Sequence, residues 1–200
     1  MIKGIIFDFG GVLTYGKAEL IYENLAKELG IKPEELTNLR NKHLNELMTG
    51  ELKILKFIQI IKNNFKINKD IIKDYKKIYT KVMHKNLNKK MFNLAYKLKK
   101  YYIISIISNM PDLHARINRN LGLFSRFYKV TLSCDVGLMK PQSKIFELAL
   151  KKLNLRPKEC IFIDDRKEHL NIPKKMGFKV INFKDNKQLI KELNKFGVKI

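Results

Sequence analysis

The chain has 200 residues and is 45% hydrophobic, which suits one large domain or a core domain with a small insert. Its formal net charge of +22 attracts anions, including phosphate esters and nucleic acid. The sequence has no zinc-finger spacing and no aromatic RNA-recognition motif, and no apolar run approaches the ~18 residues of a membrane-spanning helix. We therefore expect neither a specific nucleic-acid partner nor a membrane.

Two cysteines, Cys134 and Cys160, lie far apart in the sequence. Two thiols in a chain of this length are typical of a reducing compartment and not of a disulfide framework. The first residues have the pattern of a strand and lack the basic region and cleavage site of a signal peptide. These features predict a cytoplasmic protein, and they leave the choice between monomer and homodimer open.

The chain begins with an apolar segment, residues 5–7, that is typical of a strand buried on both faces. Asp8 follows this strand directly, and the pair Gly10 and Gly11 comes next. Ligands and catalytic groups collect at the carboxyl ends of strands in open α/β sheets, and glycines let the backbone approach a ligand closely. Asp is also a common turn residue, so these residues alone leave a functional and a structural interpretation open.

Helical spacing follows the glycine pair and continues to about residue 85. The pattern predicts four helices, of which the first is ended by Gly30 and the second is begun by Pro33. The third covers residues 54–61, and Asn68 is the expected N-cap of the fourth. Four successive helices without an intervening strand predict a compact helical insert over residues 15–85.

From Asn88 onward, predicted helices and strands alternate. Residues 135–141 are expected to form a loop, and Pro173 indicates that the helix after Asp165 starts late, with Asn171 as its cap. The alternation predicts a parallel sheet covered by helices on both faces, a three-layer, Rossmann-like α/β core built from residues 1–14 and 86–200. The strands after the first are expected at residues 102–107, 128–132, 160–163 and 179–182.

Polar residues follow three of the predicted strands, and in a parallel sheet these strand ends lie on the same edge. The polar residues are Asp8, Ser108, Asn109, Asp164 and Asp165. Lys140 lies in a Gly-Leu-Met-Lys-Pro loop before a helix. A cap, a turn or a surface lysine would explain each residue singly, but not their joint order and placement.

These residues fit phosphoryl transfer from a monoester to a carboxylate, which gives an aspartyl phosphate. Mg²⁺ suits carboxylates and backbone carbonyls, and basic and hydrogen-bonding groups hold the phosphate oxygens. The candidate metal ligands are Asp8, the Gly10 carbonyl, Asp164 and Asp165. The candidate phosphate-binding and catalytic groups beside Asp8 are Ser108, Asn109, Gly11 and Lys140.

The same segments resemble motifs one to four of the haloacid dehalogenase superfamily, in order and in spacing. They are residues 7–14, 107–109, 137–141 and 162–165. The helical insert is similar to the cap domain of that superfamily. The resemblance implies a Mg²⁺-dependent phosphatase acting on a small phosphorylated metabolite, such as a sugar phosphate. It makes Asp8 the nucleophile, Ser108 a phosphate-binding hydroxyl and Lys140 the neutralising charge, and it places the metal at Asp165 with Asp164.

Gly10 departs from the resemblance, because most phosphatases of the superfamily have a second Asp at this position as general acid and base. Such a group contributes typically 10²–10⁴-fold. Three alternatives follow: a substrate with a good leaving group, a proton from the cap or from water, or a weak or inactive phosphate-binding or interaction protein. Some phosphatases of this group resemble the chain in carrying Gly at this position.

Two further interpretations depend on other residues. Dehalogenases of the superfamily need no metal, and the pair Asp164 and Asp165 beside a carboxylate nucleophile disfavours that activity. Tyr75 and Tyr79 are expected in the core. The histidines lack a metal-ligand spacing and are expected on the surface or in the cap, with His169 the first candidate for a replacement acid. The four histidines are His43, His84, His114 and His169.

Overall fold

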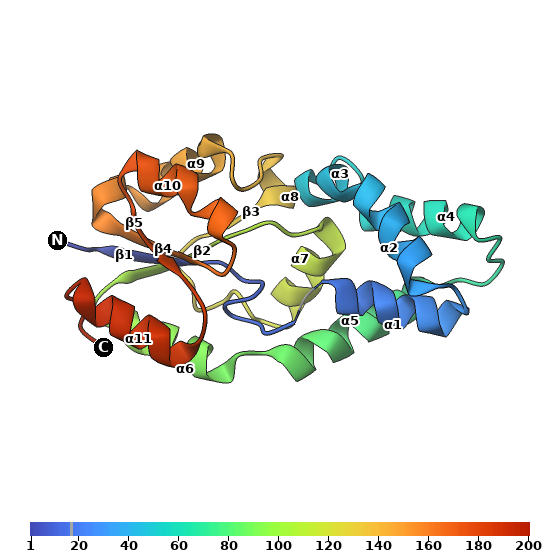
Figure 1. The fold of residues 1–200 in the computed structure, drawn as a ribbon, viewed down its shortest axis with the longest axis horizontal. Coiled ribbons are helices and arrows are strands. Elements are labelled where there is room, and N and C mark those ends of the chain that lie inside the picture. The colour runs from blue at the N-terminus through green and yellow to red at the C-terminus, as the bar shows by residue number, and fades with distance from the viewer. Residues whose placement is uncertain (17) are drawn as a thin grey trace.

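The computed structural model describes residues 1–16 and 18–200, and within these residues five parallel strands form one sheet (Figure 1). The strand order is β3-β2-β1-β4-β5, so β1 lies at the centre and pairs with both β2 and β4. This topology confirms the predicted parallel α/β sheet. The strands are β1 (Gly4–Phe7), β2 (Ile103–Ser108), β3 (Val130–Leu132), β4 (Cys160–Asp164) and β5 (Lys179–Asn182).

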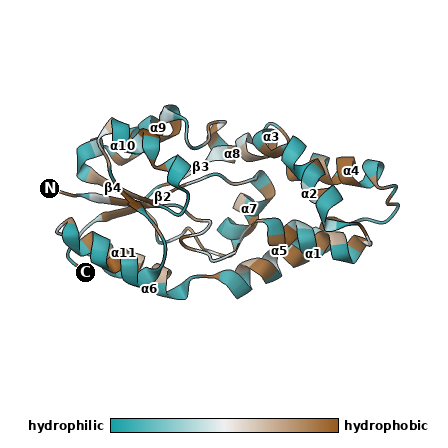
Figure 2. Ribbon diagram, in the orientation of Figure 1, coloured by the Kyte–Doolittle hydropathy of each residue, from teal (hydrophilic) through white to brown (hydrophobic). Residues whose placement is uncertain are grey.

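Helices cover both faces of the sheet, with α9 and α10 on one face and α6 and α11 on the other (Figure 1). Alternate residues of β1 enter two separate clusters of buried side chains: Ile5 and Phe7 join one, and Ile6 joins the other. Figure 2 shows hydrophobic strands between helices with hydrophilic outer faces. The helices after β1 and the insert are α6 (Lys89–Leu98), α7 (Asp112–Asn120), α8 (Ser133–Val136), α9 (Ser143–Leu153), α10 (Asn171–Met176) and α11 (Asn186–Lys195).

The insert between β1 and α6 forms a helical lobe beyond the carboxyl edge of the sheet (Figure 1). It contains five helices in the described part of the chain, and not the predicted four. The predicted second helix is divided at His43, whose amide bonds to the Arg40 carbonyl three residues back and whose ring contacts Glu46. The helices are α1 (Glu19–Leu29), α2 (Pro33–Lys42), α3 (Leu44–Thr49), α4 (Ile54–Asn64) and α5 (Ile72–Asn86).

Three predicted helix boundaries were wrong. The helix α5 begins at Ile72, and its amide is held by Asp70 Oδ1 at 2.9 Å, so Asn68 is not the cap. The helix α10 starts late, at Asn171, as Pro173 indicated, but Asn171 is its first residue and makes no side-chain cap. The expected loop at 135–141 begins within the short helix α8. In each case a local hydrogen bond or a single turn, which hydrophobic spacing does not reveal, sets the boundary.

Two predictions from composition can be compared with the fold. Both cysteines are free thiols. Across residues 1–16 and 18–200, the structure has no helix of the length and apolar character that a membrane span requires.

Candidate active site

The central strand places Asp8 at the carboxyl edge of the sheet. Phe7 pairs with Ile106 of β2 and Ile163 of β4, and the Asp8 amide continues the ladder by bonding to the Ile163 carbonyl at 2.8 Å. One residue beyond Ile163 lies Asp164, at the same level of the edge. The parallel register thus brings the ends of β1 and β4 together, as the sequence predicted.

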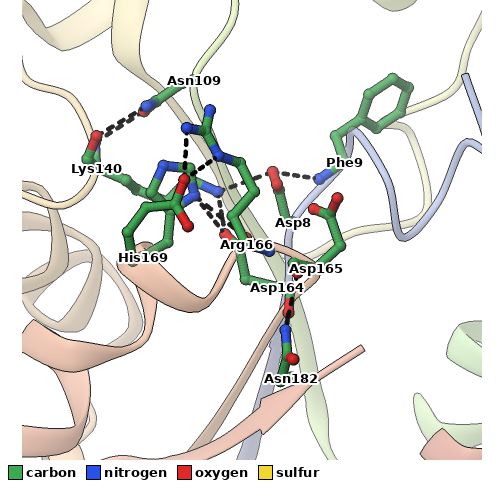
Figure 3. A network of polar contacts seen from close by, with 10 residues as sticks. Asp8, Phe9, Asn109, Lys140, Asp164, Asp165, Arg166, His169 and Asn182 are labelled. Atoms are coloured by element: carbon green, nitrogen blue, oxygen red, sulfur yellow. Dashed lines mark hydrogen bonds and ion pairs between the residues drawn. The ribbon is translucent and has the colours of Figure 1, made fainter. Parts of the chain in front are cut away.

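A buried lysine links the two carboxylates (Figure 3). Lys140 Nζ lies 2.9 Å from Asp8 Oδ1 and 2.6 Å from Asp164 Oδ2. The Lys140 side chain is fully buried, although the chain has many exposed lysines. Its position depends on Asn109, whose side-chain amide bonds to both the N–H and the carbonyl of Lys140, at 2.8 and 2.9 Å. Asn109 therefore positions the loop of Lys140, whereas its direct contact with phosphate stays a prediction.

Asp164 has two further partners. The Arg166 amide donates to Asp164 Oδ1 at 2.9 Å, and His169 Nδ1 lies 3.1 Å from Asp164 Oδ2. Ligand atoms of Asp8, Asp164 and His169 lie within 4.8 Å of one another, an arrangement that could hold a metal ion. His169 is buried, contrary to the expectation, because the single turn Lys167–His169 folds it back onto Asp164.

Asp165, the other predicted metal ligand, lies against the loop that follows Asp8. Gly11 has a φ of +78°, and a β-carbon there would overlap the Asp165 carboxyl group. Asn182 supports the same segment by donating to the Asp165 carbonyl at 2.8 Å. The glycine therefore makes room for this carboxylate, and Figure 3 shows it on the same side as Asp8.

Burial and neighbouring charges set the protonation of the three central groups. Burial raises the pKa of Asp8 to about 6, with Lys140 opposing this shift and Asp164 adding to it. Burial also raises the pKa of Asp164, but the charge of Lys140 and the hydrogen bond with His169 outweigh this effect and bring the pKa to about 2. The two carboxylates raise the pKa of Lys140 against the effect of its burial. At neutral pH the site thus holds two carboxylates and one ammonium.

Ser108 ends β2 at the same edge, and its side chain is buried. A hydrogen bond from Ser108 is among the contacts that lower the pKa of Asp8. The helix α7 begins at Asp112, four residues later, behind Pro111. The structure thus brings Asp8, Ser108, Lys140 and Asp164 together.

A cavity of about 100 Å³ separates this edge from the helical insert. It has space for several water-sized groups, since one water needs roughly 10–15 Å³. Gly10 opens into it: a β-carbon there would meet no heavy atom of the described residues within 4 Å. The residues that line the cavity include Gly10, Ser108 and Asn109 on the sheet side and Tyr22, Arg40 and Tyr79 on the insert side.

Sequence reasoning missed Arg40 as a residue of this cavity. It also expected His114 on the surface or in the cap, which was wrong, because His114 lies on α7 and lines the cavity. Both are buried, and His114 bonds to the Tyr75 hydroxyl at 2.7 Å and stacks on Tyr79 with ring centroids 4.0 Å apart. The two tyrosines are buried, as expected, although Tyr79 also lines the cavity. The burial of Arg40 could have been predicted from helical spacing. Arg40 lies four residues after the buried Leu36 and thus on the same face of α2.

Comparisons with known proteins support this description. A model for haloacid dehalogenase-like hydrolases matches residues 2–177. D-ribitol-5-phosphate phosphatase of Bacteroides thetaiotaomicron is 24% identical over 192 residues, which are 89% of this chain and 90% of that protein. Rat bifunctional epoxide hydrolase 2 is 29% identical over 116 residues, but these are 54% of this chain and 21% of that protein. The chain thus spans about a fifth of the length of this second relative.

A solved structure has the same fold. It is a family enzyme from Bacteroides thetaiotaomicron in complex with magnesium and inorganic phosphate, with a TM-score of 0.80 and 22% identity. The match covers 93% of this chain and 96% of that chain.

Proposed function

The chain belongs to the haloacid dehalogenase-like hydrolases, and we propose that it is a Mg²⁺-dependent phosphatase that acts on a small phosphorylated metabolite. The observation that carries this proposal is the buried group of Asp8, Lys140 and Asp164. Phe9 and Gly10, which follow Asp8 in the chain, line a small cavity. The relative that acts on D-ribitol-5-phosphate supports a phosphomonoester as the substrate.

Asp8 is the proposed nucleophile. With a pKa of about 6 its carboxylate is ionised at neutral pH. It attacks phosphorus, the bond to the leaving oxygen breaks, and the phosphoryl group is carried as an aspartyl phosphate. Water then attacks phosphorus, which releases phosphate and restores the Asp8 carboxylate.

Lys140 and Ser108 are proposed to stabilise the transferring phosphoryl group. The Lys140 ammonium is fixed between Asp8 and Asp164, so its charge is in place before the substrate arrives. The Ser108 hydroxyl lies at the neighbouring strand end and can donate to a phosphate oxygen. These groups offset the repulsion between the anionic substrate and the carboxylate nucleophile.

The donor set fits a hard cation. Two ionised carboxylates and one ammonium leave the site with an excess of negative charge, and Mg²⁺ prefers oxygen ligands. We propose that Asp8, the Gly10 carbonyl, Asp164 and Asp165 hold the ion, which supplies positive charge to the phosphate when bound. His169 offers a nitrogen and is proposed to orient Asp164.

The source of the proton for the leaving group is a separate question, because Gly10 offers no acid. His169 does not replace it in this proposal, since its ring nitrogen Nδ1 faces the Asp164 carboxylate. We propose one of two solutions. Either the substrate has a leaving group that departs without a proton from residue 10, or a water molecule in the cavity donates the proton. The same glycine favours the second candidate function, a phosphate-binding protein with weak activity.

A turnover assay with an activated aryl phosphate tests the proposal. We expect Mg²⁺-dependent release of phosphate, lost in Asp8→Asn and in wild type with a chelator. Asp135→Asn is the matched control, because Asp135 is exposed and pairs with Arg119 on the surface. Absence of turnover on any phosphate ester by the folded wild type would favour the binding function instead.

A further inference from the structure

Arg40 is a buried cation in the insert wall of the cavity. Its side chain is 8% exposed, and its guanidinium carbon lies 5.3 Å from the centre of the Tyr22 ring. Arg40 lines the same cavity as Gly10 and Ser108, which belong to the sheet side. The roles proposed for Asp8, Lys140 and Ser108 make no use of this charge.

The ion pair that Arg40 forms is longer than the two ion pairs of Lys140. Arg40 Nη1 lies 3.7 Å from Glu19 Oε1, on a side chain that is 46% exposed, and it donates to Asn41 Oδ1 at 3.2 Å. Lys140 has two carboxylate partners at 2.6 and 2.9 Å. A guanidinium has five N–H donors, and a buried charge without good partners is costly. Arg40 therefore has capacity for another anion.

The groups around Arg40 are neutral hydrogen-bonding groups. The Tyr22 and Tyr75 hydroxyls lie 3.4 Å apart, and burial raises the pKa of both. Burial, followed by the charge of Arg40, lowers the pKa of His114 to about 3. The insert wall thus presents one permanent cation among neutral hydroxyl groups, which is the composition of an anion-binding site.

We propose that Arg40 binds a second anionic group, a carboxylate or a second phosphate, on a short phosphate ester held at Asp8. A planar guanidinium matches either group with two parallel hydrogen bonds. Arg40 and Ser108 line opposite sides of one small cavity, so a short molecule there can contact both. This assignment rests on the proposed phosphatase function and names its substrate class.

Three esters with the same three-carbon skeleton test the assignment: glycerol phosphate, phosphoglycerate and glycerol bisphosphate. Apart from its phosphate, glycerol phosphate is neutral. Phosphoglycerate also carries a carboxylate, and glycerol bisphosphate carries a second phosphate. We expect wild type to show a kcat/KM for at least one anionic ester that is about 10- to 100-fold above that for glycerol phosphate. Of the two anionic esters, the one with the higher kcat/KM shows whether Arg40 binds a carboxylate or a phosphate.

Substitution of Arg40 should remove this preference. In Arg40→Gln the ratio of kcat/KM for the anionic esters to kcat/KM for glycerol phosphate falls toward one, because the loss is largest for the anionic esters. Arg40→Lys keeps the charge without the planar fork and should retain part of the preference. Arg116→Gln, an exposed arginine on α7, is the matched control and should leave the ratio unchanged.

The outcomes separate this inference from the function on which it rests. Equal turnover of all three esters by wild type would overturn the inference and leave the phosphatase function intact, even if Arg40→Gln does not fold. An unchanged preference in Arg40→Gln would also overturn it. Failure of wild type to turn over any ester, the aryl phosphate included, would overturn both.

Discussion

Asp8 lies in an environment that stabilises its protonated form. Burial and the nearby Asp164 oppose its ionisation more strongly than Lys140 favours it, so its pKa is about 6 against 3.8 for an exposed Asp. A buried carboxylate held in this way lowers the stability of the fold at neutral pH. Functional groups commonly have this cost.

The pH dependence of stability tests this environment. Between about pH 4 and 6, folded metal-free protein retains a proton on Asp8 that the unfolded chain has lost, so this contribution to stability falls as pH rises. Asp8→Asn lacks this contribution. We therefore expect the free energy of unfolding of Asp8→Asn, relative to that of wild type, to increase as pH rises from 4 to 6, by up to about 3 kcal/mol. Urea unfolding with chelator at several pH values measures it, and a difference that is constant with pH would contradict it.

Gly10 is open to substitution, because a side chain there would enter the cavity. We expect Gly10→Asp to supply the missing acid and to raise kcat/KM by about 10- to 100-fold on an alkyl phosphate, which has a poor leaving group. An aryl phosphate, with a good leaving group, should gain less. Gly10→Asn, of the same shape without the acid, is the control. Equal gains on both substrates, or from both variants, would count against a missing proton donor.

At the residue scale, the site residues that follow strands were predictable, and those placed by turns were not. Asp8, Ser108 and Asp164 each end an apolar strand, and a parallel sheet brings such ends together. His169 contacts Asp164 through a single 3₁₀ turn. Such a turn has no hydrophobic period, so its effect on a side chain could not be read from the sequence.

At the scale of elements, the two segments that join the insert to the core are tied together. Thr14 pairs with Leu87 in an antiparallel bridge, and the Tyr15 amide donates to the Asn86 carbonyl at 2.7 Å. Asn88 is fully buried next to this bridge. Its side chain contacts the Val12 carbonyl, the Met91 amide, the Tyr15 hydroxyl and Asn186.

Asn88 should therefore contribute strongly to stability. Asn88→Ala leaves several buried polar groups without this partner, and we expect a loss of about 2–4 kcal/mol in the free energy of unfolding. Asn93→Ala, an exposed asparagine on the same helix α6, should change it by less than ~0.5 kcal/mol. Urea denaturation of both variants provides the comparison. Equal effects of the two substitutions would contradict this role for Asn88.

The elements themselves were largely predictable, because apolar period and strand length are local signals. Gly30 ends α1 in the left-handed conformation, as expected of a glycine at that position. The division of the second predicted helix at His43 was not predictable, because a bond to the Arg40 carbonyl interrupts an otherwise continuous pattern. We retain as a proposal that residues 15–85 form a cap domain on a core of residues 1–14 and 86–200.

At the scale of the whole molecule, contacts between insert and core create the cavity. The Ile54 amide of α4 donates to Asp112 of α7 at 2.9 Å, and the Ser133 hydroxyl donates to the Met48 carbonyl. Gly50 approaches so closely that a β-carbon there would lie 2.7 Å from the Cys134 carbonyl oxygen. Because these contacts join distant parts of the sequence, neither the cavity nor the exposure of Arg40 to it was predictable.

The net charge of +22 also belongs to this scale. Lysine is spread along the whole chain, so we expect duplex DNA to bind weakly and without sequence preference. Binding at 50 mM salt should be lost at 200 mM, because it depends on counterion release. Fluorescence anisotropy at the two salt concentrations measures this loss. A tight, sequence-specific and salt-resistant complex would instead indicate a nucleic-acid function.

The central claim, that Asp8 carries the phosphoryl group, can be tested by chemical trapping during turnover. Borohydride reduces an acyl phosphate to an alcohol, so an aspartyl phosphate at position 8 becomes homoserine, which mass spectrometry of the peptide detects. We predict homoserine at position 8 in samples quenched with substrate and Mg²⁺, and none without substrate or in Asp8→Asn. Steady turnover with Asp8 unmodified, or homoserine at Asp164 or Asp165 instead, would contradict the account.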